Sequence, residues 1–440
     1  MIKRIAILFA ITGAGYGFSV LVLKYLAKYG QVAQVAGIAE VDSLIQFLIG
    51  LIGFGMQTDA IRSISFADDW KDQLAKAQQA RITLSCFLMP VALLSFHNQY
   101  FIYFLLAPVI AFSSDYALYA RGFPLVGSWV AFLRVAAPLL STLLAALFFP
   151  NHVLVTYCIA TALVYILTNA IIAWHLKTPF YYLPNLGSLK LYLNTLPLGV
   201  INLCFYFFGL GLLLVAQFFF DERELIISFV ALKFYLIYKG AIRVIQQAFV
   251  NRMKEEAVCL SIDRISIMMS VLFVGSIAIF PTTFIGIFFG DQFNNEYLFF
   301  VFLGCSAVSF SVWSSVNTRA LLERQDQTFM KIALSAVIIT LIVFFVMIQF
   351  THTSKIITLS LFVGETFFAV ALAIRFLTLN QIVLRLQFLL VCVMGLALPW
   401  VAKMWKSDQV FIYLTSFGLL GILMLILLRK KLILPQTVNL

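Results

Sequence analysis

The chain has 440 residues, of which 62% are hydrophobic and only 11% are charged. Soluble domains are about half apolar and about a quarter charged, so this composition excludes a soluble enzyme and leaves little length for a separate soluble domain. The formal net charge of +11 would suggest nucleic-acid binding in a soluble protein, but basic residues also hold the cytoplasmic loops of membrane proteins in place. We therefore expect an all-α polytopic membrane protein that binds no nucleic acid.

The residues that most often hold metals or cofactors are scattered along the chain. The four histidines lie at the edges of apolar segments, and no pair among the six cysteines has metal-ligand spacing. We therefore expect no metal and no cofactor. The apolar run that follows "MIKR" is too long for a signal peptide, so we interpret it as a retained first helix.

Long apolar stretches occupy most of the chain. A helix needs about 20 apolar residues to cross the hydrocarbon core of a bilayer, and fourteen stretches satisfy this requirement. The third and fourth are separated only by "HNQ". The predicted spans are 5–27, 36–56, 78–96, 100–120, 129–149, 153–174, 196–218, 225–249, 265–289, 297–316, 329–350, 356–377, 382–401 and 410–428.

Basic residues concentrate on one side of this pattern. If the N-terminus lies in the cytoplasm, twenty of the 30 Lys and Arg residues fall in inner segments and six in outer ones. Cytoplasmic loops are enriched in Lys and Arg, so we expect both termini to be cytoplasmic. The longest connections, 57–77, 178–195 and 250–264, all fall inside, which argues against an enzyme with a catalytic outer loop.

The two halves of the chain echo each other. "ARITLSCFLMPVALLSF" opens the third predicted helix and "DRISIMMSVLFVGSIAIF" opens the ninth, so that Arg81 pairs with Arg264. Arg121 and Arg324 pair in the same way before the fifth and eleventh helices. Because both halves start inside, we expect a parallel repeat. It would give two six-helix lobes, at 1–190 and 191–380, followed by two C-terminal helices in 381–440.

Several segments resemble, in order, a known family of transporters. "LAKYGQVAQVAGIAEVDSLIQFLIGLIGFGMQTDAIRSIS" resembles the opening of polysaccharide-unit (O-antigen, Wzx-type) flippases of the multidrug/oligosaccharidyl-lipid/polysaccharide superfamily. "LPLGVINLCFYFFGLGLLLVAQFF" resembles their seventh helix, and "VNTRALLERQDQTFMKIAL" the inner turn after their tenth. The chain departs from their pattern in two ways: it has no charge midway along the seventh helix, and it has fourteen predicted helices, as in the related lipid II flippases.

The resemblance implies a transporter rather than an enzyme. The substrate would be an oligosaccharide linked to undecaprenyl pyrophosphate in the bacterial cytoplasmic (inner) membrane. Two lobes would move it to the outer leaflet by alternating access, where polysaccharide polymerase machinery would use it for surface polysaccharide such as the O-antigen of lipopolysaccharide. Two alternatives stay open: a multidrug or cation antiporter of the same superfamily, and a membrane polysaccharide polymerase or ligase.

The eighth predicted helix contains the stretch "FVALKFYLIYKGAIRVIQQAF", which carries three cations and no acid. A charge in the middle of a bilayer is costly, so it usually faces a cavity or a partner. A cationic cavity suits a pyrophosphate, because Lys and Arg both bind phosphate. The candidates for substrate binding are the basic residues within or near the ends of predicted helices: Lys233, Lys239, Arg243, Lys24 and Arg134.

These residues also have structural interpretations. An arginine near the inner end of a helix, such as Arg134, could extend to the lipid headgroups. Glu365, midway along the twelfth predicted helix, could pair with one of the two lysines. Tyr235 and Tyr238 are candidates for sugar contacts, although packing explains them equally well. If protons or sodium drive transport, Asp42 and Glu365 are the candidates for ion coupling.

Overall fold

The computed structural model describes residues 2–28, 32–56, 59, 64, 68–97, 99–249, 253, 255–279, 281, 285–286, 297–351 and 353–404. The chain forms two compact units, Met1–Ile237 and Tyr238–Leu440. The described residues contain helices and no strand. Ten of these helices are long and apolar enough to cross a membrane, or eleven if one bent pair counts as a single span. The all-α polytopic membrane fold expected from the sequence is confirmed.

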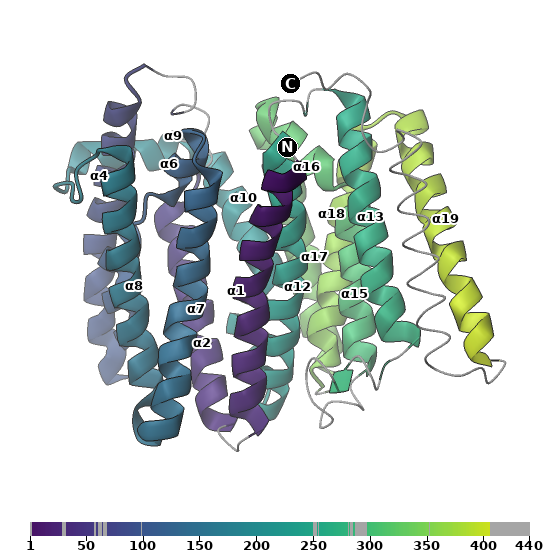
Figure 1. Ribbon diagram of the computed structural model, residues 1–440, viewed down its shortest axis with the longest axis horizontal. Coiled ribbons are helices and arrows are strands. Elements are labelled where there is room, and N and C mark those ends of the chain that lie inside the picture. The colour runs from purple at the N-terminus through teal and green to yellow at the C-terminus, as the bar shows by residue number, and fades with distance from the viewer. Residues whose placement is uncertain are drawn as a thin grey trace. The chain divides into compact units, whose positions relative to one another are not determined.

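Long helices that lie side by side make up much of the first unit (Figure 1). Within it α1 packs against α7, and α7 packs against α8. Its α-helices are α1 (Ile2–Lys28), α2 (Val32–Gly53), α4 (Trp70–Leu88), α5 (Ala107–Ala111), α6 (Asp115–Ala120), α7 (Pro124–Phe148), α8 (Val153–Leu176), α9 (Lys190–Asn194), α10 (Leu196–Tyr206), α11 (Leu212–Ala216) and the first part of α12 (Glu222–Phe249).

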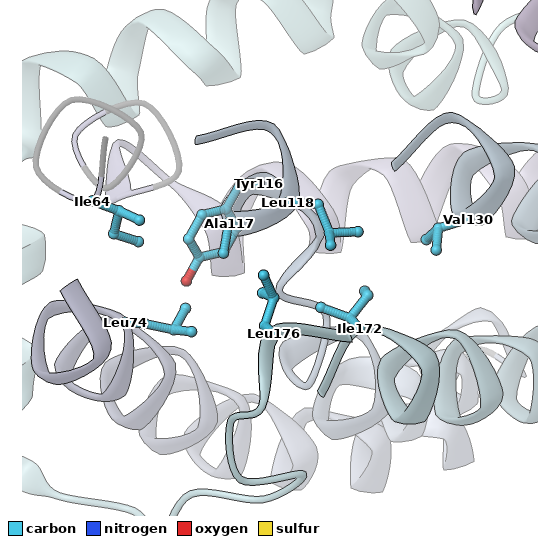
Figure 2. Packing of buried hydrophobic residues seen from close by; sticks show 8 residues of the cluster. All are labelled: Ile64, Leu74, Tyr116, Ala117, Leu118, Val130, Ile172 and Leu176. Atoms are coloured by element: carbon cyan, nitrogen blue, oxygen red, sulfur yellow. The ribbon is translucent and has the colours of Figure 1, made fainter. Parts of the chain in front are cut away.

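A buried apolar cluster holds the ends of four of these helices together (Figure 2). Leu74 comes from the first half of α4, Val130 from α7, and Ile172 with Leu176 from the last turns of α8. Fully burying side chains of this size stabilises a fold by about 1.5–3 kcal/mol each. The cluster therefore ties α4, α7 and α8 to α6, whose contribution is Tyr116, Ala117 and Leu118.

The outer face of α8 carries the signature of contact with lipid. Ile159, Leu163 and Leu167 lie four residues apart, hence on one face of the helix, and each is more than half exposed. Soluble monomers rarely expose contiguous apolar patches of this kind, so this stripe is expected to contact acyl chains.

The second unit contains the rest of α12 and six further helices in its described part. In this unit α13 packs against α15 and α19, and α18 packs against α15 and α17. The helices are α13 (Glu256–Ile279), α15 (Tyr297–Val312), α16 (Ser314–Leu322), α17 (Asp326–Met347), α18 (Lys355–Phe376) and α19 (Leu379–Met404).

Three of the predicted single spans are broken. Span 100–120 consists of a 3-10 segment (Gln99–Leu106), then α5, and then α6 after a break at 112–114. In span 297–316 the helices α15 and α16 meet at an angle of 46°. A π-helical segment, Phe207–Gly211, lies between α10 and α11 in span 196–218. Two serines mark each of two breaks, Ser113 with Ser114 and Ser314 with Ser315, but the spans are apolar enough overall to be predicted as single helices.

The broken helices α6 and α16 end in the same way. The second residue after each helix is left-handed: Gly122 has φ of 81° and Arg324 has φ of 58°. Glycine adopts this conformation freely at a helix C-terminus, whereas in a residue with a Cβ it costs conformational energy. By backbone conformation, Gly122 therefore corresponds to Arg324. The pairing inferred from the sequence, Arg121 with Arg324, differs from this by one residue.

Thirteen of the fourteen predicted spans coincide with described helices or chains of short helices. The last, 410–428, lies outside the described residues. Some boundaries were wrong because helices continue past the apolar run: α4 begins at Trp70 and α13 at Glu256. Residues expected in loops, such as Arg264, are therefore helical.

Candidate functional site

Lys233 forms an ion pair with Asp42 inside the first unit. The lysine lies near the middle of α12 and the acid near the middle of α2; their side chains are only 13% and 9% exposed. The hydroxyl of Tyr157, from α8, donates to the other carboxylate oxygen of Asp42 at 3.2 Å. The ammonium also lies 5.3 Å from the centre of the Phe229 ring, one turn earlier on α12. Three helices thus converge on one buried charge pair.

Lys239 forms the corresponding pair in the second unit. Its ammonium pairs with the carboxylate of Glu365, midway along α18, and the two side chains are 11% and 4% exposed. The ammonium lies 5.4 Å from the centre of the Phe310 ring of α15. An aromatic face attracts a cation, so the ring adds to the contact of the ammonium with Glu365.

The two lysines are therefore paired cations in separate units. Glu365 was the partner considered from the sequence for one of the two lysines, and it pairs with Lys239. Asp42, expected only as a candidate for ion coupling, is the partner of Lys233. Deleting one partner of a buried pair costs about 3–5 kcal/mol, whereas replacing both by apolar groups is often neutral. Stability alone thus gives little reason to keep either pair, and their use as binding groups stays a prediction.

Arg134 belongs to a different polar cluster of the first unit. Its guanidinium pairs with Asp115 of α6 at 3.4 Å and donates to the Thr168 hydroxyl of α8 at 3.0 Å. It also lies 4.5 Å from the centre of the Tyr165 ring. The side chain is mostly buried, so it does not extend to lipid headgroups. The structure gives Arg134 partners distinct from those of Lys233.

Arg81 is a buried cation that sequence reasoning missed. It is 0% exposed on α4, and it donates to Gln78 at 3.1 Å and to the carbonyl of Ser113. The hydroxyl of Ser113 in turn donates to Asp115 at 2.8 Å. Arg81 thus holds the break that precedes α6. Arg81 falls within the predicted third span but was counted with the basic residues of the inner side, so it was not considered as a buried cation.

The other residues predicted on α12 differ in exposure. Tyr235 is fully buried, Tyr238 is 7% exposed, and Arg243 is exposed. The Tyr238 hydroxyl donates to the carbonyl of Ser266 at 3.0 Å and bonds to the Ser311 hydroxyl. Packing and these hydrogen bonds account for both tyrosines, and their sugar contacts stay a prediction. Lys24, on α1, is half-buried.

A second cluster, also missed, joins α13, α16 and α19. Arg385 of α19 is 0% exposed and donates through Nε to Asp263 at 2.7 Å and through both Nη atoms to Glu256 at 3.1 Å. Asp263 also accepts from the backbone N–H and the hydroxyl of Ser315, both at 2.7 Å, and from the Ser314 hydroxyl at 3.1 Å. One carboxylate therefore caps the start of α16 and anchors α19.

Within the described residues no group of three or more His, Cys, Asp or Glu side chains is placed to hold a metal ion. The six cysteines are unpaired and lie at separate sites.

Comparison with known proteins gives structural matches only. No protein-family model and no curated protein matches the sequence. Among solved structures, the lipid II flippase MurJ in an inward closed conformation matches with a TM-score of 0.65 at 15% identity, covering 96% of this chain and 99% of that one. An inward-facing multidrug resistance MATE family transporter of the MOP superfamily matches with a TM-score of 0.58 at 13% identity, covering 91% and 96%.

The chain has the fold of the MurJ and MATE transporters. A eukaryotic MATE transporter, AtDTX14, matches as well, with a TM-score of 0.57 at 14% identity over 88% of this chain and 97% of that one. Because MurJ and MATE proteins share this fold and identity is low, the likeness establishes architecture and leaves substrate to the residues described above.

Proposed function

We propose that the protein is a flippase that moves an oligosaccharide linked to a polyprenyl pyrophosphate, such as undecaprenyl pyrophosphate, from the cytoplasmic to the outer leaflet. The observation that carries this proposal is the pair of nearly buried lysines on α12, Lys233 and Lys239, each paired with a single carboxylate. No acidic residue follows Glu224 on this helix. Charges retained at such a cost inside a membrane protein usually serve transport.

The chemistry of the pairs suits exchange of one anion for another. An ammonium has three N–H donors and acts as a compact point charge toward phosphate. A pyrophosphate carries more charge and more acceptor oxygens than a carboxylate, so it competes for the lysine. In the first unit, Tyr157 keeps a hydrogen bond to Asp42 while the lysine changes partner. Alternating access would then expose the two lysines to each leaflet in turn.

The likeness to MurJ supports a lipid-linked substrate, because that protein is a lipid II flippase and matches over almost its whole length. By the same proposal the protein resides in the bacterial cytoplasmic membrane, has both termini in the cytoplasm, supplies polysaccharide polymerase machinery and is not an enzyme. The competing function is multidrug or cation antiport, which the MATE matches favour. In that case Asp42 and Glu365, rather than the lysines, would bind the substrate.

A test in cells separates the two functions. Lys233→Met and Lys239→Met are introduced singly, and surface polysaccharide is quantified alongside the level of protein in the membrane. We expect each variant to lose at least tenfold in export at normal protein level, while Lys331→Ala, an exposed lysine on α17, exports normally. Unchanged export in both lysine variants, or loss of drug resistance instead of polysaccharide, would overturn the proposal.

A further inference from the structure

Residues 177–195, which join α8 to α10 in the first unit, turn back along the helices of that unit. Both α8 and α10 belong to candidate membrane spans, so this connection begins and ends at a surface of the bilayer. The N–H of Asn185 donates to the Thr83 hydroxyl of α4 at 2.8 Å. Thr83 lies five residues, about 8 Å, inside the stretch 78–96 that was predicted to cross the hydrocarbon core. The middle of the connection therefore lies at the level of the bilayer.

The backbone of this connection is held by hydrogen bonds, as an environment poor in water requires. The Phe180 carbonyl accepts from the Asn169 side chain of α8 at 3.1 Å. The Asn185 side chain accepts the N–H of Gly187 at 2.9 Å, and the Asn185 carbonyl accepts the N–H of Ser188 at 3.0 Å. The connection is thus fixed to the helices beside it, and the direction of its side chains is part of the fold.

The side chains of the connection are arranged inside out. The polar residues Ser188 and Thr195 are buried, whereas Leu183 and Leu186 are 71% and 68% exposed. A connection that faces water usually directs its leucines inward and its hydroxyl groups outward. Exposed apolar patches mark surfaces that contact a partner or a membrane, and at this level the bilayer itself is next to the protein. The two leucines are therefore placed to contact lipid.

The rest of this surface suits a layer of anionic headgroups. Phe180 in the connection and Trp174 in the last turn of α8 are exposed, and aromatic side chains are enriched at the membrane–water interface. Lys177 and Lys190 are exposed as well, and residues 177–195 contain no Asp or Glu. Lysines beside a membrane attract anionic lipids, so the charge of the connection selects among the lipids that its apolar side chains reach.

We propose that this connection binds anionic phospholipid. Leu183 and Leu186 lie at the boundary between headgroups and acyl chains, and the ammonium groups of Lys177 and Lys190 contact the phosphates. Interfacial segments bury their apolar face about 5–10 Å into this boundary, which matches the depth given by Thr83. In the proposed topology the leaflet is the cytoplasmic one. The site goes beyond the proposed function, because its ligand is bulk lipid and neither paired lysine of α12 takes part.

Photocrosslinking from single positions of the full-length protein tests this surface. A diazirine analogue of leucine replaces Leu186, Leu163 or Asp69 in turn, in nanodiscs that contain equal amounts of phosphatidylglycerol and phosphatidylcholine, and mass spectrometry quantifies the lipid adducts. Leu163, on the outer face of α8, is the lipid-facing control, and Asp69, exposed before the first turn of α4, is the water-facing control. We expect adducts at Leu186 to exceed those at Asp69 at least tenfold, and phosphatidylglycerol adducts at Leu186 to exceed phosphatidylcholine adducts at least threefold.

The double variant Lys177→Gln with Lys190→Gln should bring the ratio of the two lipids at Leu186 to about one and leave the ratio at Leu163 unchanged. Both lysines are exposed, so the variant is expected to fold. Adducts at Leu186 as rare as those at Asp69 would overturn the proposal, as would a lipid ratio that the double variant does not change. A predominant adduct with another protein in whole cells would assign the surface to a protein partner and would overturn it too.

Discussion

Asp263 is expected to be the residue whose loss most damages the second unit. Its carboxylate accepts the backbone N–H of Ser315 at 2.7 Å and pairs with Arg385 Nε at 2.7 Å. Replacement by alanine removes these interactions together and leaves a fully buried guanidinium next to a void. The helices most affected are α16, which loses its N-terminal cap, and α19, which loses its anchor.

The loss of stability in Asp263→Ala depends on which hydrogen-bond partners Arg385 keeps. Removing one member of a buried ion pair costs about 3–5 kcal/mol. Arg385 keeps Glu256 as a second acceptor at 3.1 Å, which places Asp263→Ala near the lower bound, at about 3 kcal/mol. For a unit of about 200 residues this corresponds to a fall in Tm of about 6–12 °C.

Thermal unfolding of the detergent-solubilised protein, followed by tryptophan fluorescence, measures this fall. The matched control is Glu323→Gln, which breaks a half-exposed i,i+4 pair with Arg319 and should cost at most about 0.5 kcal/mol. The double variant Asp263→Asn with Arg385→Met removes both charges but keeps an acceptor for Ser315, so it should be more stable than Asp263→Ala. If Asp263→Ala unfolds at the same temperature as the control, the reasoning is refuted.

Two further predictions concern packing and topology. Gly304→Ala should destabilise the protein by about 1–3 kcal/mol, because its new Cβ would lie 2.7 Å from Val274 Cγ2. Gly13→Ala should cost no stability, because nothing lies within 4 Å of its new Cβ. The Tm values of the two variants test this difference, and equal values would contradict it. If the inner loops carry the basic residues, a cysteine at Gly187 should react with an impermeant maleimide only in opened cells, and one at Asp221 in intact cells; the reverse pattern would invert the topology.

The helices could be predicted from the sequence because a spanning helix must be apolar over a fixed length. Where a helix continues beyond the bilayer, or carries its polar turns into the interior of a unit, the apolar run ends too early. That is why Arg264 was assigned to a loop although it lies inside α13. The breaks at 112–114 and at Trp313 were missed as well, because the Ser-Ser pair in each is flanked by residues apolar enough for a single span. Polar side chains from other helices stabilise both breaks.

Ion pairing was only partly predictable. Glu365 was identified because few acids lie deep in apolar stretches, and it pairs with Lys239. The pairing of Asp42 with Lys233 depends on how α2 packs against α12 within the first unit. The spacing of residues along the chain does not predict that packing. Arg385 was missed for the same reason, because its partner Asp263 lies on a helix that starts more than a hundred residues earlier.

Translocation by the purified protein in liposomes tests the central claim most directly. The substrate is an undecaprenyl pyrophosphate carrying a fluorescent oligosaccharide, and its arrival in the opposite leaflet is read by an impermeant quencher. The informative variants are Lys233→Met with Asp42→Asn and Lys239→Met with Glu365→Gln, which neutralise each pair without leaving a lone buried charge. The account predicts that the wild type moves the lipid and that both double variants, although folded, are at least tenfold slower. Wild-type rates in both would contradict it, because the pairs would then be structural and the substrate would be recognised elsewhere.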